Sequence, residues 1–357
     1  MCVTMNTKSY KLQPNLRMVA WEVTQTCNLF CRHCRASSRP KSYEDELTTD
    51  EGYRLLEEIS NFSRPIVILT GGEPLLRNDI FDLVSYGTKL GLPMALAVNG
   101  TLLNEEVAKR LLDSRVRRIA ISIDGASENT HDSFRGVNGA FDAAINGAKI
   151  LRKVGIPFHI STTVTKKNSD DLPYILNLAQ EIGACAFHLF MFVPLGRGKQ
   201  LIEEGITAQE YEKILNWYYD TRKTTKLTLK VVCAPQYSRI WRMRAKDEKR
   251  ISTPRAKVLD KISSRGCMAG ITFCFISSTG LLKPCGYIEK TVGDLRREEF
   301  KKLWEESSLL NNLRNLSLYK GKCRECDYLD VCGGCRARAF QYNSDYLAEE
   351  PFCVYQP

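Results

Sequence analysis

The chain has 357 residues, of which 43% are hydrophobic and 26% are charged. A chain of this length buries most of the surface that it exposes when unfolded, and its composition excludes a small disulfide scaffold, a disordered chain and a fibrous protein. The 51 lysines and arginines outnumber the 41 acidic residues and give a net charge of +10, which favours anionic partners such as carboxylates, phosphates, nucleic acid or a membrane surface.

The 14 cysteines are the unusual part of the composition. The chain has no run of the roughly 18 apolar residues that cross a bilayer, and residues 1–11 carry no export signal. We therefore expect a cytoplasmic protein with no membrane partner. In such a protein the cysteines indicate metal or redox chemistry rather than a disulfide framework.

Short apolar segments alternate with longer segments of helical period from residue 18 to residue 192. The segments predicted as strands are 18–24, 65–70, 93–98, 116–123, 157–164 and 184–192. Helices are predicted over 50–61, 104–113, 139–154 and 171–182, and another follows over 207–221. The alternation predicts an α/β fold in which six βα units form a partial TIM-like barrel.

Four regions are expected along the chain. They are a lead-in over residues 1–17, a barrel over 18–233, a basic linker over 234–262 and a small cysteine-rich domain over 263–357. The linker holds nine lysines and arginines against three acidic residues between residues 235 and 262. It is interpreted either as a solvated surface or as a basic wall that faces an acidic substrate.

Polar and glycine residues follow the first four predicted strands. Ligands of such a barrel bind beyond the C-terminal ends of its strands, so these positions form the candidate site. They are the loop 27–34, Gly71-Gly72-Glu73-Pro74, Asn99-Gly100 and Asp124-Gly125. The alternative is a set of ordinary turns, which use the same residue types.

The loop after the first strand carries Cys27, Cys31 and Cys34 in a Cx3Cx2C pattern. Three thiolates leave a tetrahedral zinc site one ligand short unless His33 is recruited. They can instead hold three corners of a [4Fe–4S] cluster and leave one iron open. This loop, with Gly71-Gly72-Glu73-Pro74 after the next strand, resembles the radical S-adenosylmethionine (radical SAM) enzymes.

The resemblance implies a role for each matching residue. Cys27, Cys31 and Cys34 would ligate the catalytic cluster, whose open iron binds S-adenosylmethionine, and His33 stands where similar enzymes often have an aromatic residue. The residues expected to contact the cosubstrate are Gly71, Gly72, Glu73, Asn99, Ser122, Asp124 and Arg135. Cleavage of the cosubstrate would give a 5′-deoxyadenosyl radical, which removes hydrogen from an unactivated carbon in an enclosed site.

Eight more cysteines near the end of the chain resemble the SPASM-type extension of radical SAM enzymes, which carries one or two auxiliary [4Fe–4S] clusters. The resemblance implies one cluster on Cys267, Cys274, Cys285 and Cys335, and another on Cys323, Cys326, Cys332 and Cys353. Two residues separate Cys332 from Cys335 where the usual pattern has three, so Cys335 departs from the family pattern.

Other interpretations of these cysteines stay open at this point. Cys323, Cys326, Cys332 and Cys335 also suit a structural zinc module, although four neighbouring cysteines would then be unexplained. Cys2, Cys185 and Cys233 stand alone in the sequence and are interpreted as small buried hydrophobic residues.

The flanks of both cysteine groups resemble the heme-synthase branch of the siroheme-dependent heme pathway. They are Trp21-Glu-Val-Thr-Gln-Thr-Cys27, Cys34-Arg35-Ala36, Cys332-Gly-Gly-Cys335-Arg-Ala-Arg-Ala339 and Tyr346-Leu-Ala-Glu-Glu-Pro351. The resemblance implies oxidative decarboxylation of two propionates of iron-coproporphyrin III to vinyl groups, which gives heme b. An auxiliary cluster would accept the released electrons, and ferredoxin or flavodoxin would be the donor.

A substrate with four propionates fits an excess of basic residues, because arginine is the favoured partner of a carboxylate. The candidates are Arg35, Arg197, Arg336 and Arg338, which adjoin the cluster motifs or follow the sixth strand. His159 or His188 could ligate the substrate iron, although a histidine satisfied in the core or at the surface is the commoner case.

Three other functions fit parts of the sequence. A sister branch of the family would remove acetate side chains from a siroheme derivative. A ribosomal-peptide maturase would share both cysteine regions but usually has an N-terminal recognition domain, where this chain has only residues 1–17 before the first strand. A metal-dependent nucleic-acid-binding module is disfavoured by scattered charge and by the lack of a recognised motif, so no nucleic-acid partner is expected.

Overall fold

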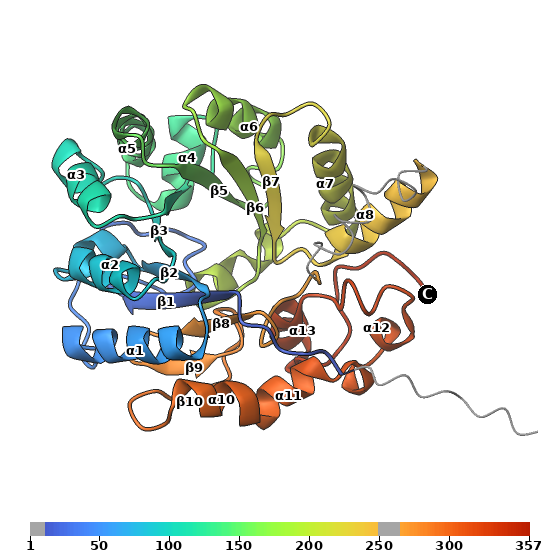
Figure 1. Cartoon of the computed structure of the whole chain (residues 1–357). Coiled ribbons are helices and arrows are strands. Elements are labelled where there is room, and N and C mark those ends of the chain that lie inside the picture. The colour runs from blue at the N-terminus through green and yellow to red at the C-terminus, as the bar shows by residue number, and fades with distance from the viewer. Residues whose placement is uncertain (1–10, 249–264) are drawn as a thin grey trace, which may run out of the picture.

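The computed structural model describes residues 11–248 and 265–357. These residues form one ten-stranded sheet in the order β10-β9-β8-β1-β2-β3-β4-β5-β6-β7 (Figure 1). The consecutive parallel strands are β1 Met18–Thr24, β2 Ile66–Gly71, β3 Met94–Val98, β4 Arg118–Ser122, β5 Phe158–Val164, β6 Ala186–Met191 and β7 Thr228–Val232. The predicted parallel βα sheet is confirmed, and β7 is a seventh parallel strand that the sequence pattern did not indicate.

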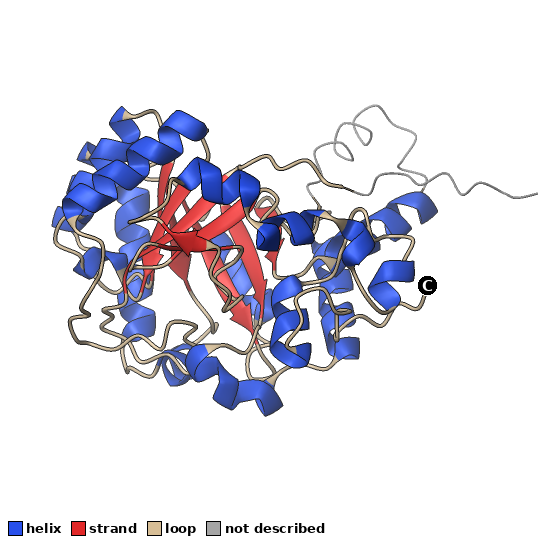
Figure 2. Cartoon of the chain, turned by 90° about the horizontal axis from the view of Figure 1, so that it is seen from below, coloured by secondary structure: helices blue, strands red, loops and turns tan. Residues whose placement is uncertain are grey.

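Helices connect these strands and cover the outer side of the curved sheet (Figures 1 and 2). They are α1 Thr49–Phe62, α2 Ile80–Lys89, α3 Glu105–Asp113, α4 Glu128–Arg135, α5 Ala140–Val154, α6 Leu172–Glu181 and α7 Ala208–Thr221. The five predicted helices are confirmed. Among the described residues, no helix has both the length and the apolar character needed to cross a membrane.

The strands of the sheet present two different faces. Val19 and Trp21 of β1 are fully buried against the helices, where a Cβ added to Gly52 of α1 would lie 2.8 Å from Trp21. Met18 and Ala20, which alternate with them, point to the concave side and are partly exposed, and β5 shows the same alternation of burial. We call the space on this concave side the lumen. The small residues that line it are Ala20, Ala95, Ala97, Ala120, Ser122 and Ser161.

The C-terminal region continues this sheet. Strand β8 Phe273–Ile276 pairs in parallel with β1, and β9 Leu281–Lys283 and β10 Gly293–Asp294 follow in antiparallel order. Beyond this edge lie α10 Phe300–Glu306, α11 Ser308–Arg314, α12 Lys322–Glu325 and α13 Arg336–Asn343 (Figure 1). The sheet therefore runs across the expected domain border at residue 263.

Helix α8 Gln236–Asp247 occupies the first half of the expected basic linker, and residues 249–264 lie outside the described residues. Arg239 of α8 is only 3% exposed and forms an ion pair with Glu212 of α7 at 2.5 Å. A linker is the wrong description of residues 236–247, because a buried, paired arginine anchors this helix to the barrel.

Candidate functional site

The loop that follows β1 brings three thiols into one small apolar cluster. Cys27 and Cys31 are buried there beside Leu29, and Cys34 packs against them. The backbone N–H of Leu29 donates to the Sγ of Cys27 at 3.4 Å, and the N–H of Ser38 donates to the Sγ of Cys34 at 3.4 Å. Backbone donors of this kind stabilise negative charge on sulfur.

Three thiolates this close together repel one another, and an iron–sulfur cluster would compensate their charge. Burial raises the pKa of Cys27 to about 12 and also raises that of Cys31, and the neighbouring thiolates add to both shifts. Three thiolates so close together therefore need a positively charged partner. The irons of a [4Fe–4S] cluster provide that charge and take thiolate ligands, so the donor set fits the group.

The two glycines of the predicted GGEP motif lie against the chain that leads into the cluster loop. The N–H of Gly72 donates to the carbonyl of Thr24 at 2.8 Å, and the N–H of Glu73 donates to that of Thr26 at 2.8 Å. A Cβ on Gly71 would lie 2.3 Å from the Thr24 oxygen, and one on Gly72 would lie 2.3 Å from the Thr26 oxygen. No residue other than glycine fits this approach, which fixes the start of the loop.

Glu73 ties the cluster loop to the end of β3. Its fully buried carboxyl accepts the N–H of Leu75 at 3.1 Å and the N–H of Asn99 at 2.7 Å. Burial raises the pKa of Glu73 to about 7 even though both backbone donors favour its charged form. The side chain of Asn99 in turn donates to the Oδ1 of Asn28 at 2.8 Å, inside the cluster loop.

Asp124 and Arg135, both predicted to contact the cosubstrate, pair with each other. The Nη2 of Arg135 lies 2.5 Å from the Oδ2 of Asp124, and its Nη1 donates to the Sγ of Cys31 at 3.7 Å. Burial alone would lower the pKa of Arg135, but the carboxylate of Asp124 raises it, so the guanidinium stays charged. The Nε of Arg135 is buried without a partner among the described residues. The pair thus places positive charge beside a cluster thiol and leaves one donor unused.

His33 contacts this ion pair, and Ser122 ends the strand that precedes Asp124. His33 stacks on Phe134 with ring centroids 4.2 Å apart, and its Nε2 lies 3.8 Å from the Oδ2 of Asp124. Burial lowers the pKa of His33 well below its usual range, so the imidazole is neutral. Ser122 is the last residue of β4 and belongs to the partly exposed lumen face. We call the C-terminal ends of the barrel strands the rim and the loop 27–34 the rim loop or cluster loop. The residues expected there do meet at one place in the fold.

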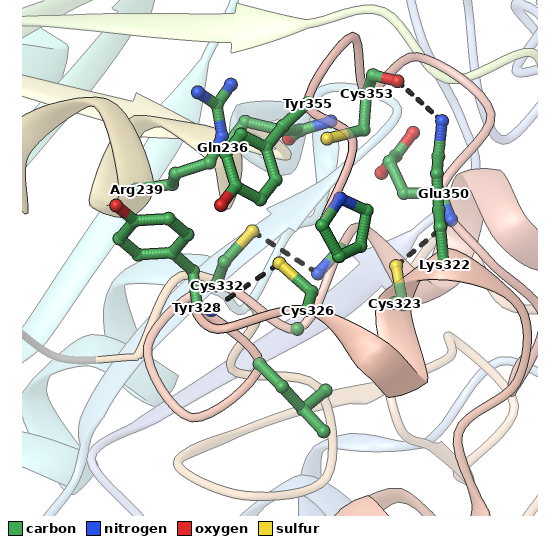
Figure 3. A pocket seen from close by; sticks show the side chains of 14 residues that line it. Gln236, Arg239, Lys322, Cys323, Cys326, Tyr328, Cys332, Glu350, Cys353 and Tyr355 are labelled. Atoms are coloured by element: carbon green, nitrogen blue, oxygen red, sulfur yellow. Dashed lines mark hydrogen bonds between the residues drawn. The ribbon is translucent and has the colours of Figure 1, made fainter. Parts of the chain in front are cut away.

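Four of the C-terminal cysteines line one small cavity. Figure 3 shows Cys323, Cys326, Cys332 and Cys353 around it. Their thiols accept backbone N–H groups, from Tyr328 to Cys326 at 3.4 Å and from Gly334 to Cys332 at 3.5 Å. The structure therefore brings together the four cysteines that the sequence grouped.

The other predicted group of four is assembled differently from the expectation. Cys267, Cys285 and Cys335 gather in an apolar cluster with Cys233, which directly follows β7. Interaction with the Cys233 thiol lowers the pKa of Cys335 below its usual range. Sequence reasoning had taken Cys233 for a lone buried residue. Its position at the C-terminal end of a parallel strand was the signal that it missed, because β7 itself was not predicted.

Cys274 does not join that group. It lies in β8, where it pairs in register with Val19, and both side chains face the helices in the main hydrophobic core. Burial raises the pKa of Cys274, and Arg314 is the only charged neighbour that affects it among the described residues. The predicted grouping of Cys274 with Cys267 is wrong because the strand register turns its thiol away.

Comparisons with known proteins show the family of the chain. The model of the radical SAM superfamily matches residues 21–179, and that of the SPASM iron–sulfur cluster-binding domain matches residues 267–336. The AdoMet-dependent heme synthase of Oleidesulfovibrio alaskensis is 47% identical and covers 96% of this chain and 88% of its own length. That of Methanosarcina barkeri is 44% identical over 96% of this chain and 97% of its own, and the Fe-coproporphyrin III synthase of the same organism is 30% identical over 94% and 87%.

The chain belongs to the AdoMet-dependent heme synthase family of radical SAM enzymes. As a radical SAM enzyme it works with a [4Fe–4S] cluster and S-adenosylmethionine, which confirms the cofactors predicted from the sequence. Among solved structures, Streptococcus suis SuiB bound to S-adenosylmethionine matches with a TM-score of 0.75 at 17% identity, covering 96% of this chain and 78% of that one. Native anSMEcpe with bound AdoMet matches with a TM-score of 0.70 at 19% identity, covering 95% and 94%. These two likenesses concern the fold.

Three of the four candidate arginines of this radical SAM enzyme form hydrogen bonds with other parts of the protein. Arg197 donates to the carbonyls of Cys31 at 2.9 Å and Ser38 at 2.6 Å and so holds the cluster loop. Arg336 and Arg338 are at most 1% exposed, and Arg336 donates to the carbonyl of Ala348 at 2.6 Å. Most donors of these arginines already serve the protein, but the Nη2 of Arg197 and the Nη1 of Arg338 are buried without a partner among the described residues. Their binding of substrate carboxylates therefore stays a prediction.

Arg338 forms a buried network of its own. It pairs with Glu350 at 2.9 Å and donates to the hydroxyl of Tyr211 at 2.9 Å, while Glu350 also accepts the N–H of Cys335 at 2.5 Å. The network links α7 of the barrel to a cysteine of the C-terminal region.

Arg35 lines a cavity between the barrel and the C-terminal region. The cavity measures about 390 Å³ and is bounded by the end of the cluster loop, Leu195 and Gly196 after β6, and β8 and β9. Arg35 pairs with Glu22 at 2.6 Å and lies 4.5 Å above the ring of Phe275. It is the candidate arginine that lines this cavity.

Tyr287 was not singled out by the sequence. Burial raises its pKa, and the thiolates of Cys233, Cys285 and Cys34 act on it in the same direction. Tyr287 packs in the same apolar cluster as Cys233 and Cys285, and Cys34 of the rim loop also affects its pKa. It is a candidate contact for whatever occupies the space between the two sites.

Proposed function

We propose that this enzyme oxidatively decarboxylates two propionates of iron-coproporphyrin III to vinyl groups and so forms heme b. The observation that carries the proposal is the 47% identity to an AdoMet-dependent heme synthase over 96% of the chain. In each step a propionate gives up one hydrogen atom, carbon dioxide and one electron, and the alkene remains. The protein therefore has to hold the macrocycle at the barrel rim and keep water from the reacting carbon.

The proposed ligands of the catalytic cluster are Cys27, Cys31 and Cys34. With S-adenosylmethionine bound, this group supplies the radical chemistry that removes a hydrogen atom from the substrate. The remaining rim residues fall into two proposed roles. Gly71, Gly72 and Glu73 fix the loop, while Asn99, Ser122, Asp124 and Arg135 surround the position of the cosubstrate. The unused Nε of Arg135 supports a direct contact with a cosubstrate carboxylate.

For the auxiliary clusters we propose two sets of ligands. Cys323, Cys326, Cys332 and Cys353 would hold one, and their shared cavity supports this set. Cys233, Cys267, Cys285 and Cys335 would hold the other, which replaces Cys274 with Cys233. Iron and acid-labile sulfide analysis tests both, because a structural zinc module would give zinc and at most one cluster's iron.

The decisive experiment incubates the anaerobically reconstituted enzyme with reductant, S-adenosylmethionine and iron-coproporphyrin III, followed by mass spectrometry. Ferredoxin or flavodoxin is the proposed physiological donor and replaces the chemical reductant in a second arm. Loss of two carboxyl groups from the porphyrin, with release of 5′-deoxyadenosine, is the expected result.

Two other outcomes would replace the proposal. Removal of acetate groups from a siroheme derivative would assign the enzyme to a sister branch. Such a branch is the second candidate because the chain is also 30% identical to an Fe-coproporphyrin III synthase and 32% identical to a pre-heme d1 synthase. Tight binding of a leader peptide without binding of iron-coproporphyrin III would indicate a peptide maturase.

A further inference from the structure

Four basic side chains meet at the N-terminal end of the lumen, away from the cluster loop. Arg118 of β4, His159 of β5, His188 of β6 and Lys230 of β7 lie on the lumen faces of adjacent strands, with His188 opposite Lys230 in the register. The rings of His159 and His188 are 3.9 Å apart. We call these four residues the basic floor.

The charge of the basic floor is not balanced by any acidic group. Burial lowers the pKa of His159 to about 4 and that of His188 to about 2, and Arg118 and Lys230 add to both shifts. The two histidines are thus neutral at pH 7, and the lysine and arginine carry the charge. No carboxylate pairs with Arg118 or Lys230 in the part of the chain that the structure describes, where the Nζ of Lys230 has only the Sδ of Met18 at 4.0 Å.

Hydrogen-bonding capacity is also unused at this end. The Nδ1 of His159 is buried and has no partner among the described residues. Buried polar atoms are normally hydrogen-bonded, and a buried cation without a counterion is costly, so the partly buried Lys230 and the Nδ1 of His159 favour an anionic ligand. Arg118 is exposed at the start of β4 and adds positive charge at the same end.

The lumen face between the floor and the rim is partly exposed. Interiors of (βα) barrels are ordinarily filled by branched residues, but many lumen-facing positions here carry the alanines and serines named above. At about 3.3 Å per residue, His159 lies roughly 13 Å along β5 from Thr163. The N–H of Thr163 donates to Asp124 beside the cluster loop at 2.7 Å. The floor and the rim thus lie at opposite ends of the lumen face of β5.

We propose that the basic floor binds the carboxylates of the substrate that do not react, and so holds the macrocycle with another edge toward the rim. This inference rests on the proposed function, because it takes the substrate to be a tetrapyrrole with several propionates. Arg118 and Lys230 supply the charge, and His159 and His188 supply neutral donors.

The test measures binding of iron-coproporphyrin III to the anaerobic holoenzyme by the change in its Soret absorption. Arg118→Gln and Lys230→Met each remove one floor cation, and loss of a hydrogen bond to a charged group raises Kd by about tenfold to a hundredfold. Lys230→Arg keeps the charge and is expected to restore most of the affinity. Iron content and circular dichroism check that each variant folds.

Matched controls come from the neighbouring chain. Arg117 is exposed and adjacent to Arg118, and Lys226 is exposed just before β7. Arg117→Gln and Lys226→Met are expected to leave Kd unchanged. The tetramethyl ester of iron-coproporphyrin III has no carboxylates and is expected to bind weakly and equally to the wild type and to the floor variants.

The outcomes separate this inference from the proposed function. If the wild type binds and converts iron-coproporphyrin III but the floor variants bind it as tightly as the controls do, the floor inference is wrong and the function stands. If the wild type neither binds nor converts it while cleaving S-adenosylmethionine, the proposed function falls and the floor inference falls with it.

Discussion

The rim loop and the cysteine group near β7 gather thiols in opposite ways. At the rim, Cys27, Cys31 and Cys34 come from one loop, and backbone N–H groups within it hold the sulfurs. Near β7, Cys233 comes from the end of the barrel and meets cysteines that lie far later in the chain. A site built from one loop can be read from residue spacing, whereas a site built from several elements can be read only once strand order is known.

The largest expected effect concerns the rim. Cys31→Ala removes a ligand that lies against Arg135, and we expect complete loss of 5′-deoxyadenosine release under any electron supply. High-performance liquid chromatography of anaerobic reactions measures it. Cys185→Ala, which changes an exposed cysteine, serves as the control and is expected to retain full release. Cleavage at the wild-type rate by the Cys31 variant would remove the rim loop from the catalytic centre.

A matched pair of cysteines sharpens the comparison next. Cys233→Ala is expected to lose iron equivalent to one cluster and most porphyrin turnover. Cys274→Ala is expected to keep its iron and to lose only about 1–2 kcal/mol of stability, because it leaves a small cavity in the core. Iron analysis, electron paramagnetic resonance and thermal unfolding distinguish the two. The reverse pattern would restore Cys274 as the ligand.

Gly72→Ala tests whether the rim depends on close backbone approach. The added Cβ would meet the Thr26 oxygen at 2.3 Å and displace the start of the loop, with an expected cost of about 1–3 kcal/mol and reduced iron in the catalytic cluster. Gly139→Ala is the control. Unlike Gly72 it has a left-handed backbone, and no atom lies within 4 Å of its added Cβ, so it is expected to lose stability without losing iron. Equal iron content in both variants would contradict this role of Gly72.

Arg338→Met tests the buried network that joins α7 to the other cysteine group. Removing one partner of the pair with Glu350 leaves an uncompensated buried carboxylate, so we expect a loss of about 3–5 kcal/mol. Chemical unfolding measures it. The double variant Arg338→Met/Glu350→Gln is expected to recover part of the loss. A single variant as stable as the wild type would show that the network does not support this region.

The smallest effect concerns the surface contact between α1 and the C-terminal region. Arg296 pairs with Glu51 at 2.8 Å, and the hydrogen bond from Arg296 lowers the pKa of Glu51 to about 2. A lowered carboxyl pKa stabilises the fold above the ordinary value of about 4.5 and loses that contribution as pH falls toward 2. Since the pair is solvent-screened, a double-mutant cycle with Glu51→Gln and Arg296→Gln should give about 0.5–1 kcal/mol at pH 7 and less at pH 3. A coupling that grows at pH 3 would contradict this assignment.

Much of the barrel and the rim loop could be predicted because their signals are local. Strands with apolar alternation and a Cx3Cx2C loop need only nearby residues to be recognised. Cys233 could not be placed because β7 is a short strand with Lys230 at its centre, and strand pairing with β6 forms it. Cys274 has a spacing that suits a ligand, but the register with Val19 decides its direction.

The candidate arginines show the same limit in another form. A sequence gives the charge of Arg336 and Arg338 but not the groups that they pair with. The partner of Arg338, Glu350, lies 12 residues later in the chain. Only the folded chain shows that one carboxylate pairs with Arg338 and at the same time accepts the N–H of Cys335.

Strand β8 is hydrogen-bonded to β1 through four consecutive residue pairs from Met18 to Trp21. A C-terminal region joined by a flexible linker could move relative to the barrel. One whose strand pairs with β1 cannot move without breaking those backbone hydrogen bonds. The separation between the two groups of thiols is consequently fixed when the chain folds, and electron exchange across it needs no docking event and gains nothing from diffusion.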